Sequence, residues 1–188
     1  MPYLVASIIS VVTAMVILFT RYEADDSTIK AELENMRVMF SIVDGFVNTY
    51  IESGGNLSDL STFELGNSGI LLASMAVTPS TVTSTSTTLE KLKTTTTLPN
   101  SKVIWQLIPN IADSSSYKVL VDIRGNAGLM SKALFSESFI GREFCEKNLF
   151  GTFQKSMRGF NGTDDFVDNS GPSIDTLRDG LLVCIVYK

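Results

Sequence analysis

Few residue types in this chain of 188 residues could carry catalytic chemistry. The sequence contains no histidine, so it lacks the commonest general base and the commonest metal ligand of proteins. A Ser-His-Asp or Cys-His site is therefore excluded, and neither a glycine-rich phosphate loop nor a CxxC pair is present. We expect the protein not to be an enzyme and to use no cofactor.

The two cysteines, Cys145 and Cys184, both lie in the last quarter of the chain. In an oxidising compartment such a pair is typical of a disulfide, whereas in the cytosol it is typical of two buried thiols. Cys145 falls in a stretch with helical spacing and Cys184 in an apolar strand, so a bond between a helix and a sheet is geometrically reasonable. Both alternatives stay open at this level.

Acidic residues supply the remaining candidate for a binding site. Asp164, Asp165 and Asp168 lie close together, but their spacing lacks the pattern of a calcium loop and its terminal glutamate. We expect a solvated acidic loop and no metal site. The formal net charge of -5 argues against nucleic acid as the main partner, because binding to phosphates needs a basic surface.

The first 20 residues contain no charged side chain, and Arg21 ends this apolar run. A helix of 20 residues rises about 30 Å, which is the thickness of the hydrocarbon core of a bilayer. The run therefore predicts a membrane-inserted helix. A cleaved signal peptide fits less well than a single-pass anchor or a mature N-terminus, since no Lys or Arg precedes the apolar residues.

Apolar residues continue past this run at the three- and four-residue spacing of one helix face. The first part of the seam, which lies in the apolar run and just after it and would pack on neighbouring helices, comprises Val5, Ile8, Val12, Met15, Phe19 and Tyr22. The part beyond it, which would pack on a globular domain, comprises Ile29, Leu33, Met36, Phe40, Val43, Val47 and Tyr50. One helix over residues 1–52, ended by Gly54 and Gly55, is predicted. A short coiled coil beside a membrane anchor is the alternative.

Residues 53–101 are predicted to be a connection, with a Thr/Ser-rich part over 78–97 that forms an exposed loop or the edge of a sheet. Residues 102–188 are predicted to be a globular domain built on an antiparallel sheet. Its predicted strands are Val103 to Ile108, Tyr117 to Ile123 and Leu181 to Tyr187. The first two form an antiparallel pair, and the last, apolar on both faces, lies inside the sheet. A helix over 129–149, interrupted at Gly141, precedes the last strand.

The predicted fold class is thus α+β, and the order of its parts resembles the type IV pilins and pseudopilins, with the type IVb branch closest. Members of that family have a long N-terminal helix, half inserted in the membrane and half packed on an antiparallel sheet. A variable connection and a C-terminal region bounded by a disulfide follow. Residues 1–52 are similar to the helix, 53–101 to the connection, and the segment from Cys145 to Cys184 to the disulfide-bounded region.

The resemblance implies a structural subunit that polymerises through its N-terminal helix with copies of itself and with other pilins. It implies inner-membrane assembly machinery as a partner, residence in the inner membrane before assembly, and a final place in an extracellular filament. Met1 would be the processed and methylated N-terminus, and a location outside the cytoplasm favours the Cys145–Cys184 disulfide.

One departure from the family pattern is Val5. The family normally has a glutamate at the fifth mature position, and subunits that lack it include tip-initiating minor pilins and pseudopilins. The rival hypothesis is a single-pass membrane protein whose periplasmic or extracellular domain binds a ligand or a partner.

Overall fold

The computed structural model describes residues 30–126, 141–154 and 180–188. The chain forms two compact units, residues 1–36 and residues 37–188. In the first unit the described residues, 30–36, are helical. In the second unit residues 37–52 are helical, and an antiparallel sheet follows.

The elements after the helix are short. In chain order they are the 3₁₀ turn η1 (Leu57–Asp59), α2 (Thr62–Asn67), α3 (Thr88–Leu92), β1 (Thr96–Thr97), β2 (Ile104–Pro109), β3 (Ser116–Asp122), the π-helical turn η3 (Phe144–Asn148), β4 (Thr152–Gln154) and β5 (Leu181–Tyr187). Residues 141–143 are helical and lead directly into η3.

The sheet has five strands in the order β1-β2-β3-β5-β4, and every neighbouring pair is antiparallel. The predicted α+β class with an antiparallel sheet is therefore confirmed. β2 and β3 form the predicted pair, in a register that places Trp105 opposite Val121. β5 lies between β3 and β4, with Cys184 opposite Val119, and its place inside the sheet agrees with its apolar sequence.

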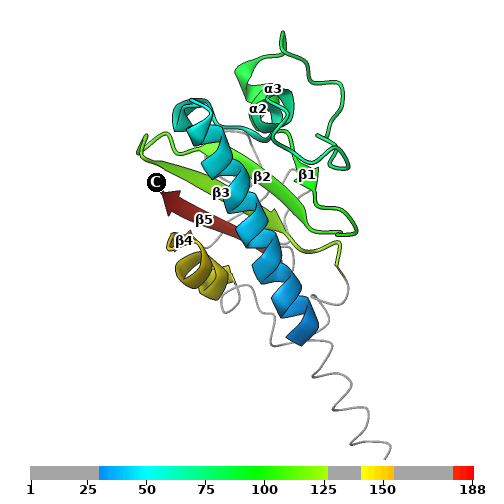
Figure 1. Ribbon diagram of the computed structural model, residues 1–188, viewed down its shortest axis with the longest axis vertical. Coiled ribbons are helices and arrows are strands. Elements are labelled where there is room, and N and C mark those ends of the chain that lie inside the picture. Colours follow the sequence, from blue (N-terminus) through cyan, green and yellow to red (C-terminus); the bar gives the residue numbers. More distant parts are fainter. Residues whose placement is uncertain (1–29, 127–140, 155–179) are drawn as a thin grey trace, which may run out of the picture. The chain divides into compact units, whose positions relative to one another are not determined.

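Each face of the sheet has its own apolar cover. Residues 37–52 cross one face (Figure 1), where the ring of Phe40 meets Trp105 edge to face, with 4.9 Å between centroids, and stacks on Phe144 at 5.2 Å. On the other face Ile108, Leu120 and Val183 form a buried cluster, and Leu92 of α3 packs against it. The cover on both faces explains why β2, β3 and β5 carry apolar side chains on both sides.

The end of the helix is a Schellman turn. The N–H of Gly55 donates to the carbonyl of Tyr50, and the N–H of Gly54 donates to that of Ile51, both at 2.9 Å. Gly54 has φ +92°, which residues with a side chain rarely adopt. The predicted stop at these two glycines is confirmed.

The Thr/Ser-rich part of the connection is more ordered than the sequence prediction of an exposed loop or edge. Thr87 and Glu90 form a capping box that starts α3, with the hydroxyl and carboxylate each bonded to the other residue's backbone N–H. Thr96 is buried in β1, which forms the predicted edge of the sheet. The prediction missed α3 because a five-residue helix is too short to show a period.

Several predictions fall outside the described residues. These are the apolar run and its seam from Val5 to Tyr22, the processed end at Met1, Ile29, most of the helix over 129–149, and the acidic loop with Asp164, Asp165 and Asp168.

Candidate functional site

The seam residues of the helix occupy its inner face. Leu33 is half-buried, and the following members are buried: Met36, Phe40, Val43, Val47 and Tyr50. Val38, on the opposite face, is 51% exposed. The helix is therefore amphipathic, as the three- and four-residue spacing predicts.

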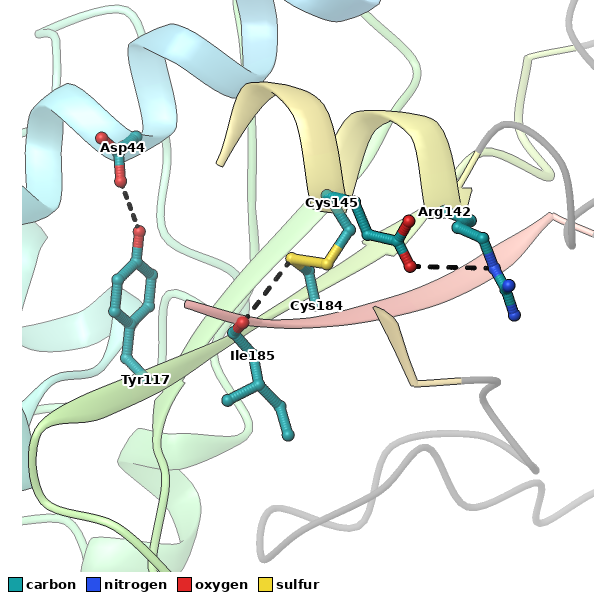
Figure 2. The surroundings of a disulfide bond; sticks show 7 residues. Asp44, Tyr117, Arg142, Cys145, Cys184 and Ile185 are labelled. Atoms are coloured by element: carbon teal, nitrogen blue, oxygen red, sulfur yellow. Dashed lines mark hydrogen bonds and ion pairs between the residues drawn. A yellow bond between two sulfur atoms is a disulfide. The ribbon is translucent and has the colours of Figure 1, made fainter. Parts of the chain in front are cut away.

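A polar contact crosses the interface between helix and sheet (Figure 2). The Oη of Tyr117, on β3, donates a 2.8 Å hydrogen bond to Oδ1 of Asp44 on the helix. The Nζ of Lys188 lies 2.6 Å from the same oxygen, and Nδ2 of Asn48 donates to Oδ2 at 3.1 Å. The carboxylate of Asp44 thus has a partner on each of its two oxygens, which a half-buried charge requires.

Burial raises the pKa of Tyr117 far above its usual value, and the negative charge of Asp44 and the hydrogen bond to it act in the same direction. The phenol therefore stays protonated and serves as a hydrogen-bond donor. Its position is structural, because the side chain is fully buried and cannot meet a substrate.

The disulfide joins the π turn to the sheet. Cys145 in η3 and Cys184 in β5, 39 positions apart in the sequence, form an S–S bond with their Cα atoms 5.4 Å apart (Figure 2). Both cysteines are fully buried. The predicted bond between a helix and the sheet is present, and it closes the C-terminal part of the chain into a covalent loop.

The chain that leaves η3 passes directly beside this disulfide. The N–H of Gly151 donates to the carbonyl of Cys145 at 2.9 Å. A Cβ at Gly151 would lie 2.7 Å from Sγ of Cys184 and still closer to the carbonyl oxygen of Ile185. Glycine is therefore the residue type that fits here. Sequence reasoning did not single out this position.

The polar interface was also missed at the level of sequence. Asp44 lies between apolar seam residues, three positions before Val47, so its carboxylate had to point toward the sheet or beside it. The sign of this polar contact in the sequence was a charged residue, Asp44, beside a stripe of core-facing residues. Its partner, Tyr117, is 73 residues away and could not be found from local spacing.

The described residues offer little reactive chemistry. They contain no group of three Cys, Asp or Glu side chains that could hold a metal ion. Among the helices of the described ranges, none combines the length and the apolar character needed to cross a bilayer. Comparisons with protein-family models, with curated proteins and with solved structures give no match.

Proposed function

We propose that this chain is a structural subunit of a pilus-like filament and polymerises through its hydrophobic N-terminal helix, in the manner of the type IV pilins that its layout resembles. One observation carries the proposal. An uncharged run of 20 residues precedes a helix whose inner face is apolar, and residues 37–52 of that helix pack on an antiparallel sheet.

The packing of the helix supports this assignment. Phe40, Val43 and Val47 are almost completely buried in the domain, whereas the residues of the apolar run, such as Val12 and Met15, have no polar face to turn to water. In a helix such a run needs lipid or other apolar helices around it. A filament core of bundled helices and a bilayer are the two environments that satisfy this need.

The disulfide supports a location outside the cytoplasm. Cys145 and Cys184 are fully buried and bonded, and disulfides persist in oxidising compartments. A subunit held in the inner membrane by its first helix, with its sheet domain in the periplasm, has its cysteines in such a compartment. Assembly machinery of the inner membrane then transfers it to an extracellular filament.

The driving force of polymerisation is the burial of apolar surface. Each large side chain of the first helix is stabilised by about 1.5–3 kcal/mol when it is kept out of water. Neighbouring helices replace lipid around residues such as Val12 and Phe19 as the subunit leaves the membrane. Val5, in place of the glutamate of typical subunits, favours a role at the tip of the filament or in a secretion pseudopilus.

Substitutions in the apolar run test the proposal. Val12→Asp and Met15→Lys place a charge in the filament core and should abolish incorporation into surface filaments, whereas Val12→Leu should preserve it. Ile111→Asp, at a side chain that is 68% exposed in the domain, is the matched control for an added charge. The measurement is the amount of subunit in filaments sheared from cells and seen by negative-stain electron microscopy.

Normal amounts of Val12→Asp and Met15→Lys subunits in filaments would refute the polymerisation role. The level of each variant in the membrane fraction is measured in parallel, since loss of the protein would mimic loss of assembly. Mass spectrometry of the mature N-terminus adds an independent test. A methylated Met1 supports a processed pilin-like subunit, and an unprocessed start supports a simple single-pass anchor.

A further inference from the structure

The most exposed large apolar side chain that the structure describes is that of Phe150, between η3 and β4. It is 84% exposed, and its φ of +52° lies in the left-handed region. Glycine usually occupies this position after a helix, since a bulky residue there is strained. The neighbours of Phe150 fix it, because Leu149 is buried and the N–H of Gly151 donates to the carbonyl of Cys145 at 2.9 Å. The fold therefore holds an aromatic ring in water at an energetic cost, which suggests a function for the ring.

Two further exposed apolar side chains lie at the same end of the sheet as Phe150. Ile111 is in the turn that joins β2 to β3, and Tyr187 is the last residue of β5. The register defines this end of the sheet, because β3 begins opposite Tyr187 and β4 begins opposite Ile185. Single exposed apolar side chains are common on protein surfaces, whereas a group of them is typical of an interaction surface.

A mainly apolar pocket of about 400 Å³ lies in the connection between the helix and the sheet. None of the described residues that line it is charged. Its apolar lining includes Phe63, Leu71, Leu72, Met75, Val77 and Pro79. An apolar cavity of about 150 Å³ is large enough to bind benzene, so this pocket has room for a phenylalanine ring.

Phe150 and the pocket lie at opposite edges of the sheet. Next to the pocket residues, the carbonyl of Ala76 accepts a 3.1 Å hydrogen bond from the hydroxyl of Thr96 in β1, and Thr78 pairs with Thr95. β1 is one edge strand, and β4, which follows Phe150, is the other (Figure 1). Four strand spacings separate these edges by roughly 19 Å. The ring therefore cannot enter the pocket of its own molecule, whereas it can enter that of a second copy.

We propose that the ring of Phe150 inserts into this pocket on a second copy of the chain. The two surfaces match, because an apolar ring meets an uncharged and mainly apolar lining. The cations of η3 beside the ring are already paired with carboxylates. Lys147 lies 3.2 Å from Glu143, and Arg142 lies 3.9 Å from Glu146. An anionic bilayer surface is a less suitable partner for the ring, because it attracts uncompensated cations.

A contact between two different surfaces is heterologous, and its repetition gives an open series of subunits. This inference rests on the proposed function, in which such a series forms a filament. A buried phenylalanine covers about 150–250 Å², which is much less than the roughly 1,000 Å² of a stable interface. The contact is therefore weak between isolated subunits, and in a filament it adds to the packing of the N-terminal helices.

Cysteine cross-linking tests the contact and leaves the ring and the apolar lining in place. Thr152→Cys puts a thiol two residues after Phe150, and Ser80→Cys puts one on the pocket lining, both at exposed positions. The full-length double variant is concentrated in a neutral detergent and treated with a short bismaleimide, which does not react with the Cys145–Cys184 disulfide. We expect a ladder of dimers, trimers and longer products. Dimers alone would indicate a mutual pair and the absence of products would indicate no contact, and either result would overturn the proposal.

The ladder should depend on the ring of Phe150. Adding Phe150→Gly should reduce its yield several-fold, and should raise the midpoint of thermal unfolding because glycine adopts a φ of +52° without strain. Val38→Ala, which shortens an exposed apolar side chain on the outer face of the helix, is the matched control and should leave the ladder unchanged. An unchanged ladder in Phe150→Gly, or an equal loss in Val38→Ala, would refute the contact. A lower midpoint in Phe150→Gly would also refute it, because the ring would then have a structural role.

The same double variant in cells separates this inference from the filament role. Filaments whose subunits give no ladder would refute the contact and leave the filament role in place. A ladder in detergent, together with an absence of filaments on wild-type cells, would support the contact between two copies and refute the filament role. Ladders in both settings would support both proposals.

Discussion

The hydroxyl of Tyr117 donates a 2.8 Å hydrogen bond to the carboxylate of Asp44, and this bond joins the middle strand of the sheet to the helix. It is a polar bond at the border of an interface that is otherwise formed by apolar side chains such as Phe40 and Trp105. Apolar packing holds the helix against the sheet without directional preference, and a hydrogen bond to a charged group favours one position along it.

Tyr117→Phe should lower the free energy of unfolding by about 1.5–3 kcal/mol, because the lost hydrogen bond has a charged acceptor. Asp44 keeps Lys188 and Asn48 as partners, so the loss should stay within this range. Urea denaturation measures the change. Tyr187→Phe, at a half-exposed ring, is the control and should change stability by less than about 0.5 kcal/mol. Equal effects of the two variants would show that the bond to Asp44 adds nothing.

Alkaline pH should destabilise the protein through Tyr117. Its pKa is raised in the folded state, so above pH of about 10 the unfolded chain releases the phenol proton while the folded chain retains it. The stabilising contribution is therefore complete below pH of about 10 and decreases above it, by about 1.4 kcal/mol per pH unit for this one group. Unfolding curves between pH 9 and 11 should show a shallower pH dependence for Tyr117→Phe. An identical dependence would contradict the raised pKa.

Reduction of the disulfide should lower stability by about 4 kcal/mol, since the bond closes a loop of 39 residues in the chain-entropy model. The double variant Cys145→Ala/Cys184→Ala should lose a similar amount, and a reductant should then have no further effect on it. Guanidinium unfolding with and without reductant measures both values. If oxidised and reduced wild-type protein unfold at the same midpoint, the bond has no stabilising role.

Two glycines should respond in opposite directions to alanine. At Gly151 a Cβ would lie 2.7 Å from Sγ of Cys184, so Gly151→Ala should force the chain away from the disulfide and destabilise the domain by about 1–3 kcal/mol. At Gly45, inside the helix, a Cβ would meet nothing within 4 Å. Gly45→Ala should therefore stabilise by about 0.5–1 kcal/mol through helix propensity. Thermal unfolding of the two variants shows whether each substitution stabilises or destabilises the domain.

Phe40→Ala should be the most damaging change in the helix. The ring packs between Trp105 and Phe144 and is fully buried, so its removal should cost about 3–5 kcal/mol. Val38→Ala, two residues earlier on the exposed face, should lie within about 0.5 kcal/mol of the wild type. Comparable losses in both variants would mean that the helix does not pack by this face.

The sequence alone determined the features that depend only on residues close together in the chain. The helical spacing around Phe40 and Val47 predicted the buried face, Gly54 and Gly55 predicted the stop, and the fully apolar β5 predicted an internal strand. Each of these follows from the period of a single element or from the backbone freedom of glycine. The two cysteines were visible as a possible pair, and the compartment implied by the resemblance favoured a bond between them.

Only the tertiary structure decided which distant groups meet. Asp44 and Tyr117 are 73 residues apart, and the close passage of Gly151 beside Cys184 depends on how β4 pairs with β5. The side-chain amide of Gln106 on β2 donates to the carbonyl of Leu92 in α3, and α3 is too short to show a period in the sequence. Side-chain spacing reports which face of an element is buried, whereas the partner on that face is set by the path of the whole chain.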